Sequence, residues 1–230
     1  MRLRVDVASD AKSLAWDDLH GPARGVVYGL LREHDPVLAQ SLHDDGWRGQ
    51  PMKPVGVACP RFRGARRKKG VYTTSPEGSV WFASPVPEIA SALVAALARR
   101  TEIEWGAVKL RVRGFTVDIG DGIAADGPVE VATATPVVVR HDGQDLLPGD
   151  DFYLERVTHN LAHKADVLGL PAPRGLRVLE SGPRRRFAVR GAPRIGARVR
   201  LAMEADARFV DALRSWGVGL DTIQGFGWVE

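Results

Sequence analysis

A glycine-rich stretch, Trp216–Trp228, constrains the fold of this 230-residue chain more than any other feature of its sequence. It holds two Gly-x-Gly pairs that five residues separate: Gly217, Gly219, Gly225 and Gly227. Glycine permits a positive φ and a close backbone approach, and successive amides of such a loop can point at a phosphate. The alternative interpretation is a tight turn from a helix into a strand. The common nucleotide-binding glycine motifs are excluded, because they open a helix after a strand, whereas an apolar helix precedes these glycines.

The periodicity of the first half predicts one strand-helix-strand-strand-helix-strand unit. Apolar and polar residues alternate in the first segment, and the helical segments place apolar residues three and four positions apart. The expected elements are a strand at Arg2–Ala8, a helix at Ala23–Asp35 that restarts as Val37–His43, strands at Lys53–Arg63 and Ser79–Ser84, a helix at Pro87–Arg100 and a strand at Val108–Val117. This order is that of a ferredoxin-like domain.

The same order of elements is predicted a second time. The expected elements are a strand at Val129–Arg140, a helix at Asp151–Leu168, a strand at Gly175–Glu180, a longer hairpin region at Arg186–Met203, a helix at Ala207–Trp216 and a last short strand at Trp228-Val229. The turn-rich segment between the halves predicts a linker at 120–128. We therefore predict an α+β protein with tandem ferredoxin-like (RRM-like) βαββαβ domains at 1–119 and 129–230.

Composition and cysteine content exclude several classes of protein. The chain is 44% hydrophobic and 26% charged, which is typical of a globular protein, and it lacks the ~20-residue apolar run of a membrane helix. Its first residues lack the apolar core of a signal peptide, so we expect a cytoplasmic protein without a membrane partner. The single cysteine, Cys59, excludes an intrachain disulfide. No metal-binding motif or acidic cluster is present, so we expect neither a metal nor another cofactor.

Two basic segments indicate a polyanionic partner. From Arg174 to Arg200 there are nine arginines and one acid, and the segment from Arg61 to Lys69 contains no acid. A merely solvated surface would intersperse acids among the bases, whereas arginine binds phosphate bidentately and stacks on bases. The predicted RNA-binding residues in these segments are Arg61, Arg63, Arg66, Arg67, Lys68, Lys69, Arg184, Arg185, Arg186 and Arg190.

Four motifs in this order resemble a known family. A helix ends in Leu42-His43, Thr135-Pro136 opens an apolar strand, Asn160 to Lys164 reads Asn-Leu-x-x-Lys, and the glycine-rich stretch follows. Together they resemble the CRISPR-associated endoribonucleases that process repeat RNA, ferredoxin-like members of the repeat-associated RNA-binding superfamily. One departure is Asp221, which lies between the glycine pairs and would repel phosphate. The four glycine amides are nevertheless expected to be available to RNA.

The resemblance implies a reaction and its residues. It implies metal-independent cleavage of CRISPR repeat RNA in the precursor transcript by attack of the 2′-hydroxyl, giving 2′,3′-cyclic phosphate and 5′-hydroxyl ends. His43 stands where the family has its catalytic histidine, Tyr28 where some members have a tyrosine, and Lys53 resembles the family's lysine. Histidine transfers protons near neutral pH, and an ammonium stabilises charge on phosphate.

Other interpretations of these residues and of the function stay open. His43 could cap the C-terminus of its helix, Tyr28 could be a half-buried aromatic residue, and His34 is a weaker candidate for the proton carrier. The alternative function is a non-catalytic RNA-binding subunit of a CRISPR effector complex, which would not need His43. The expected partners are the repeat RNA, with effector-complex subunits and a second copy of the chain as further possibilities.

Overall fold

The computed structural model describes residues 1–68, 70–119, 126–189 and 192–230. Its first half contains β1 (Arg2–Ala8), β2 (Ser13–Ala15), the 3-10 helix η1 (Trp16–Asp18), α1 (Ala23–His34), α2 (Pro36–Asp44), β3 (Gly56–Phe62), β4 (Arg67–Lys68), β5 (Val71–Thr73), β6 (Gly78–Ala83), α3 (Pro87–Leu97), β7 (Glu102–Trp105) and β8 (Val108–Asp118). Its second half contains β9 (Gly127–Ala132), β10 (Val139–His141), β11 (Gln144–Leu146), α4 (Tyr153–Leu168), β12 (Arg174–Ser181), β13 (Arg185–Val189), β14 (Ala192–Gly196), β15 (Val199–Ala205), α5 (Ala207–Trp216) and the 3-10 helix η2 (Thr222–Gln224).

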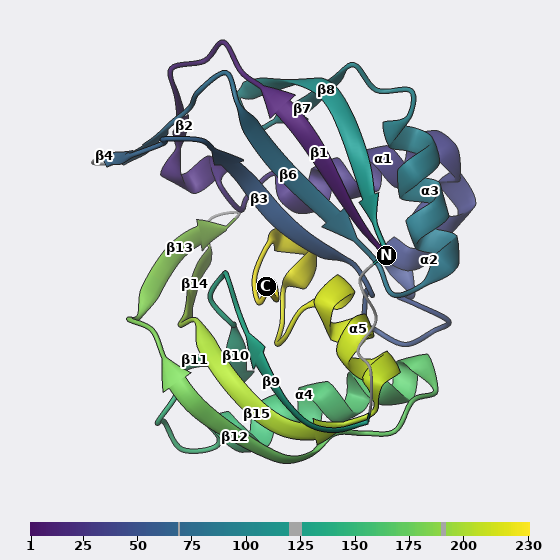
Figure 1. Cartoon of the computed structure of the whole chain (residues 1–230), viewed down its shortest axis with the longest axis vertical. Coiled ribbons are helices and arrows are strands. Elements are labelled where there is room, and N and C mark those ends of the chain that lie inside the picture. Colours follow the sequence, from purple (N-terminus) through teal and green to yellow (C-terminus); the bar gives the residue numbers. More distant parts are fainter. Residues whose placement is uncertain (69, 120–125, 190–191) are drawn as a thin grey trace.

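The first half forms an antiparallel sheet in the order β3-β6-β1-β8-β7. The alternation in β1 explains its central place, because Leu3, Val5 and Val7 are fully buried in a core that α1 and α3 also line. Figure 1 shows this sheet above the second half, with the helices on one of its faces. The order of β3, β6, β1 and β8 is that of a ferredoxin-like sheet, and β7 adds an edge strand that the sequence pattern did not predict.

The second half repeats this topology with a shorter last strand. Its sheet has the order β12-β15-β9, and Val229 forms a single antiparallel bridge with Thr133, at the end of β9. The predicted strand 129–140 is wrong as one element. β9 ends at Ala132, and after Pro136 the chain bridges instead to the β14–β15 turn and the glycine-rich stretch. Proline donates no backbone hydrogen bond, so a continuous ladder through this position is disfavoured.

The fold class is the predicted α+β tandem ferredoxin-like arrangement. Most of the predicted 120–128 linker lies outside the described residues, so the domain boundary stays a prediction. Within the described ranges, no helix is long and apolar enough to cross a membrane.

The C-terminal segment joins the two halves, and Figure 1 shows it between the two sheets. Arg2 of β1 donates to the backbone oxygens of Arg214 and Val229, and its guanidinium lies 4.3 Å from the ring centre of Trp228. A Cβ on Gly56 of β3 would lie 2.6 Å from the Ser215 carbonyl oxygen of α5. The halves are therefore in close backbone contact through α5 and the residues that follow it.

Candidate active site and nucleic-acid interface

The glycine-rich stretch binds itself and other parts of the protein through its backbone amides instead of presenting them to a phosphate. We refer to residues Trp216–Trp228 in this arrangement as the clasp. The four glycine amides donate to protein acceptors: Gly217 to Leu213 O at 2.6 Å, Gly219 to Asn160 Oδ1 at 3.1 Å, Gly225 to Thr222 O at 3.0 Å and Gly227 to Pro136 O at 2.8 Å. All four glycines are buried. The expectation that these amides are available to RNA is therefore wrong, because the loop uses them to close on itself and on the second half.

None of these four glycines has space for a side chain, and Gly227 and Gly225 are the most tightly packed. A Cβ on Gly227 would lie 1.7 Å from Val218 O, and a Cβ on Gly225 would lie 2.4 Å from Cys59 Sγ in β3. Both also have a positive φ, at +62° and +89°. Glycine is required at 225 by close packing against the first half and at 227 by close packing within the glycine-rich stretch, and at both positions by backbone conformation.

The Asn-Leu-x-x-Lys motif on α4 forms two hydrogen bonds with the backbone of the clasp. Asn160 accepts from the Gly219 amide, and Lys164 Nζ donates to Gly217 O at 2.6 Å. The ammonium of Lys164 lies 4.8 Å from the ring centre of Trp216 and is fully buried, and this burial lowers its pKa to about 7. Two of the four sequence motifs thus meet in one hydrogen-bonded structure.

His43, in the last turn of α2, lies against Tyr28 in the middle of α1. Asp35 starts α2 by accepting from the Leu38 amide at 2.9 Å, and His43 occupies the last turn, exposed to solvent. Its ring centre lies 5.2 Å from that of buried Tyr28, at an interplanar angle of 70°. His43 Nδ1 lies 2.8 Å from Asp44 Oδ1. If Nδ1 donates to this carboxylate, the neutral ring keeps its lone pair on Nε2.

Lys53 lies within electrostatic range of residues that surround His43 and Tyr28. The hydrogen bond from His43 is the main cause that lowers the pKa of Asp44. Burial, then the nearby Arg24 charge, lowers the pKa of Lys53, and Asp44 opposes this shift. Burial raises the pKa of Tyr28, against the effect of Arg24, whose guanidinium lies 5.6 Å from the Tyr28 ring centre. The structure thus places His43 against Tyr28 and Asp44, with Arg24 beside Tyr28, and Lys53 within electrostatic range of Arg24 and Asp44, two residues that the sequence analysis missed.

Asp44 and Arg24 could have been noticed from their spacing. Asp44 directly follows His43, and Arg24 lies one helical turn before Tyr28 on α1. We refer to His43, Asp44, Tyr28, Arg24 and Lys53 as the His43 cluster.

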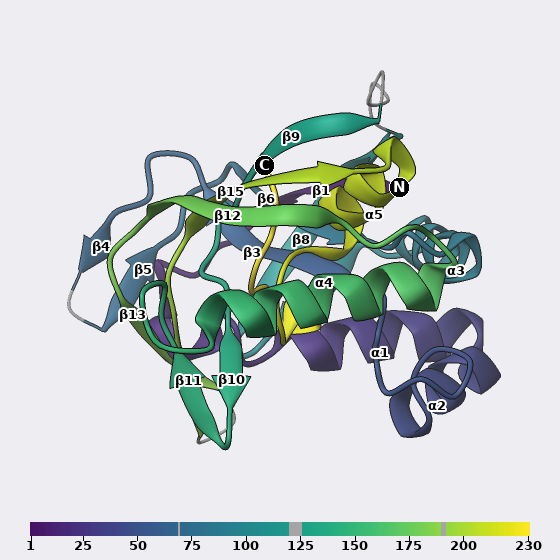
Figure 2. The ribbon, with the colours of Figure 1, turned by 90° about the horizontal axis from the view of Figure 1, so that it is seen from below.

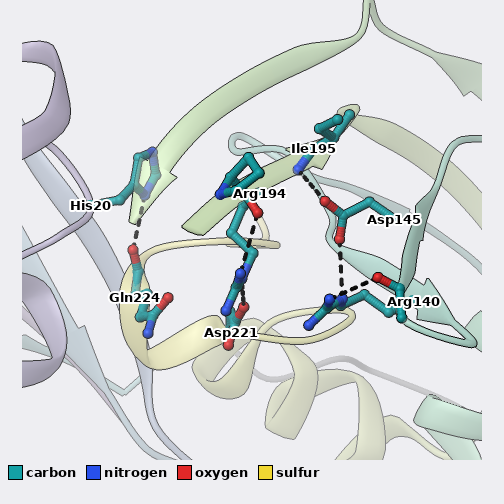
Figure 3. A network of polar contacts seen from close by, with 9 residues as sticks. His20, Arg140, Asp145, Arg194, Ile195, Asp221 and Gln224 are labelled. Carbon is teal, nitrogen blue, oxygen red and sulfur yellow. Dashed lines mark hydrogen bonds and ion pairs between the residues drawn. The ribbon is translucent and has the colours of Figure 1, made fainter. Parts of the chain in front are cut away.

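A cavity of about 320 Å³ lies beside this cluster. Five basic residues line it, Arg24, Lys53, Arg140, Lys164 and Arg194, with Asp221 as its acidic residue. Figure 3 shows that Arg194 extends to Asp221, where Nε and Oδ2 are 2.5 Å apart, and that Arg140 Nε is 3.3 Å from Asp145 Oδ1. The charge of Asp221, which alone would repel phosphate, is therefore compensated by Arg194.

Each of the two predicted basic segments contributes to a hairpin that lies away from His43, β4–β5 for the first and β13–β14 for the second. Figures 1 and 2 place the β4–β5 and β13–β14 hairpins at one end of the molecule and α2 at the other. The side chains of Arg61, Arg63, Arg66, Lys68, Arg184, Arg185 and Arg186 are exposed. Lys69 and Arg190 lie outside the described residues, as does the side chain of Arg67.

Several of these basic side chains are engaged within the protein. Arg61 Nη2 donates to Ala134 O at 3.4 Å, and Arg63 pairs with Glu77 at 3.0 Å, an acid that follows the first segment. Arg200 lies on β15, outside the β13–β14 hairpin, and pairs with Glu180 on β12 at 3.5 Å. Among the described side chains, no group of three potential ligands could hold a metal ion.

Comparison with known proteins finds the same fold in solved structures. No protein-family model matches the sequence, and no curated protein does. A Cas6-related protein from Pyrococcus furiosus superposes with a TM-score of 0.82 at 18% identity, covering 100% of this chain and 97% of its own. A RAMP protein described as binding different RNA substrates gives 0.80 at 18% identity over 100% and 98% of the two chains. A CRISPR-associated protein Cas6 gives 0.77 at 19% identity, again over 100% and 98%. The chain therefore has, over its whole length, the fold of the Cas6 proteins.

Proposed function

We propose that this protein is an endoribonuclease that cuts CRISPR repeat RNA within a precursor transcript, without a metal ion. The observation that carries the proposal is the His43 cluster, in which a solvent-exposed imidazole lies against Tyr28 and Asp44, with Lys53 and Arg24 close by. It supplies a proton carrier, an orienting carboxylate and cations for the charge that develops on phosphate.

The proposed reaction needs only the substrate's own nucleophile. The 2′-oxygen forms a bond to the adjacent phosphorus while the bond from phosphorus to the 5′-oxygen breaks. The 2′-hydroxyl loses a proton and the 5′-oxygen gains one, which gives a 2′,3′-cyclic phosphate and a 5′-hydroxyl. His43 accepts the 2′-hydroxyl proton on Nε2, the resulting imidazolium gives a proton to the departing 5′-oxygen, and Asp44 holds the ring through Nδ1. Lys53 stabilises the phosphorane-like charge, and Tyr28 orients the imidazole.

The basic hairpins fit a long RNA ligand. RNA that reaches from the β13–β14 hairpin to the His43 cluster would pass the basic cavity, since Arg194 on β14 and Arg24 on α1 both line it. Solvent-exposed arginines give affinity through phosphate contacts without sequence information. We therefore assign the exposed hairpin arginines to binding and the His43 cluster to chemistry.

The decisive experiment compares His43→Ala with His34→Ala on a repeat-containing RNA in excess EDTA. His43→Ala should slow cleavage by about 10²–10⁴, the usual contribution of general acid–base catalysis, with little change in affinity. His34 is exposed at the end of α1, so its replacement should leave the rate unchanged. One 2′-deoxy nucleotide just upstream of the cut should abolish cleavage while binding persists.

The same experiment identifies the rival function. Tight binding of the repeat RNA by the unaltered protein without any cleavage would favour a non-catalytic subunit of an effector complex. Cleavage by His43→Ala at the unaltered rate would remove His43 from the mechanism. Cleavage of the 2′-deoxy substrate would exclude attack by the 2′-hydroxyl.

A further inference from the structure

The basic cavity has the size and charge of a site for a small anionic group. Its volume of about 320 Å³ is at the lower end of the range for ligand pockets, ~300–1,000 Å³. Four arginine and lysine side chains besides the buried Lys164, whose pKa is lowered to about 7, line this concave surface with one acid, and they attract anions. Apolar surface is present too, because Leu220 and Met52 line the same cavity.

Two arginines of the cavity are held in place by carboxylates. Arg194 pairs through Nε with Asp221, and its side chain is only 18% exposed. Arg140 pairs through Nε with Asp145 and donates Nη2 to Gly143 O at 2.9 Å. A guanidinium has five N–H donors, so these contacts leave donors for a ligand. Because Arg194 is mostly buried and held by Asp221, it loses little side-chain entropy when it binds an anion, whereas the Arg140 side chain is 41% exposed and is held less tightly.

The backbone at Asp221 supports a functional interpretation of its ion pair. Asp221 has a φ of +56°, in the left-handed region that residues other than glycine seldom adopt. Such conformations cost free energy and cluster at binding and catalytic sites. Here the strained residue presents its carboxylate to the arginine that lines the cavity (Figure 3).

Gln224 gives the cavity an unpaired polar group. Its backbone oxygen is fixed by His20 Nδ1 at 2.9 Å, and its side chain, which lines the cavity, is 5% exposed. In the described part of the chain, no donor reaches the buried Oε1 of Gln224. A buried acceptor without a partner is destabilising, because its hydrogen bonds to water are lost and not replaced. An amino group or ring N–H of a nucleobase is a donor that would satisfy it.

The cavity is continuous with the His43 cluster. Arg24 and Lys53 line the cavity, and both act electrostatically on members of that cluster. A group bound in the cavity therefore contacts the same two cations, Arg24 and Lys53, that act on the His43 cluster.

From these observations, and on the basis of the proposed function, we propose that the cavity is a subsite for one nucleotide of the RNA next to the scissile phosphate. Arg140 and Arg194 bind its phosphate, and the Gln224 amide pairs with the edge of its base. Leu220 and Met52 provide apolar surface for the base. This subsite makes recognition at one position of the RNA depend on the base as well as on the backbone.

A binding experiment tests the base contact independently of cleavage. The repeat RNA carries a 2′-deoxy nucleotide at the cut, and an abasic residue is moved through the remaining positions one at a time. In the unaltered protein, one abasic position beside the cut should lower affinity about tenfold, the size of one base contact. Gln224→Met is similar in volume and lacks the amide but keeps the apolar contacts, so this variant should reduce that position's effect and leave the effects of the other positions unchanged.

Salt dependence tests the phosphate contacts. Arg194→Ala and Arg140→Ala should each reduce the slope of log affinity against log salt by about 0.7, the value for one contact to a single strand. The matched control is Arg208→Ala, an exposed arginine on α5 that pairs with Asp206 away from the cavity. It should leave the slope unchanged. Thermal unfolding of each variant separates loss of binding from loss of folding.

The outcomes separate this proposal from the proposed function. An abasic profile that Gln224→Met leaves unchanged, or cavity arginines that behave like Arg208, would overturn the subsite even if the protein cuts RNA. A protein that shows the expected profile and slopes but never cuts would keep the subsite and lose the nuclease assignment. A protein that binds no repeat RNA would overturn both.

Discussion

Replacing Gly225 by alanine should destabilise the whole protein, because this residue packs the C-terminal clasp against the first half. Its φ of +89° requires a left-handed conformation, which costs an alanine about 1–2 kcal/mol. The added Cβ would also lie 2.4 Å from Cys59 Sγ and 3.2 Å from His20 Nδ1. Overpacking of a tight core typically costs about 1–3 kcal/mol. We therefore expect a loss of about 2–5 kcal/mol from a total stability of about 5–15 kcal/mol.

Urea unfolding of matched variants measures the two contributions separately. Gly143→Ala is the control, since Gly143 has a φ of +80° and no described atom lies within 4 Å of a Cβ added there, so it should show only the conformational cost. Cys59→Ala removes the atom that clashes. A double-mutant cycle between Gly225→Ala and Cys59→Ala should therefore give a coupling of about 1–3 kcal/mol. Equal losses for Gly225→Ala and Gly143→Ala, together with zero coupling, would refute the clasp.

Two further expectations concern pH and salt. Burial lowers the pKa of His20 to about 4, so the unfolded chain binds more protons than the folded chain between pH ~6.5 and ~4. The free energy of unfolding should therefore fall by up to ~3 kcal/mol as the pH is lowered from ~6.5 to ~4. His20→Phe keeps the stacking on Phe226 and should lose this pH dependence, as measured by urea unfolding at several pH values. The same pH dependence in both proteins would contradict the assignment. Replacing Arg184, Arg185 and Arg186 together by alanine should weaken RNA binding and reduce its salt slope by about 0.7 per lost phosphate contact. Fluorescence anisotropy at several salt concentrations measures this, and an unchanged slope would make the three arginines a solvated surface only.

The motifs that suggested a family are interlocked in the structure. The Gly227 amide donates to Pro136 O, and the Trp228 amide donates to Thr135 Oγ1. On α4, Asn160 and Lys164 bind Gly219 and Gly217. Three distant stretches of sequence thus depend on one another through hydrogen bonds of the clasp. Their joint occurrence is therefore explained by the hydrogen bonds that they form with one another.

The sequence by itself determined the fold class, because periodicity is a local property. The alternation of Leu3, Val5 and Val7 places β1 in the centre of a sheet, and the helical spacing before Gly217 predicts α5 with the bounds that the structure shows. Local patterns also located His43 in the last turn of a helix. Single-residue features such as the break at Pro136 were missed, since an apolar run reads as one strand until its partners are known.

Tertiary structure decided what the glycines and cations do. Whether a glycine amide is free depends on acceptors such as Asn160, which lies 59 residues away from Gly219 in the chain. Whether Asp221 repels phosphate depends on Arg194, which pairs with it from the β13–β14 hairpin. The basic cavity draws residues from both halves, and no sequence window contains them together. Local sequence patterns specify the elements, whereas the electrostatics and hydrogen bonding of a site depend on which distant side chains the fold brings within a few ångströms.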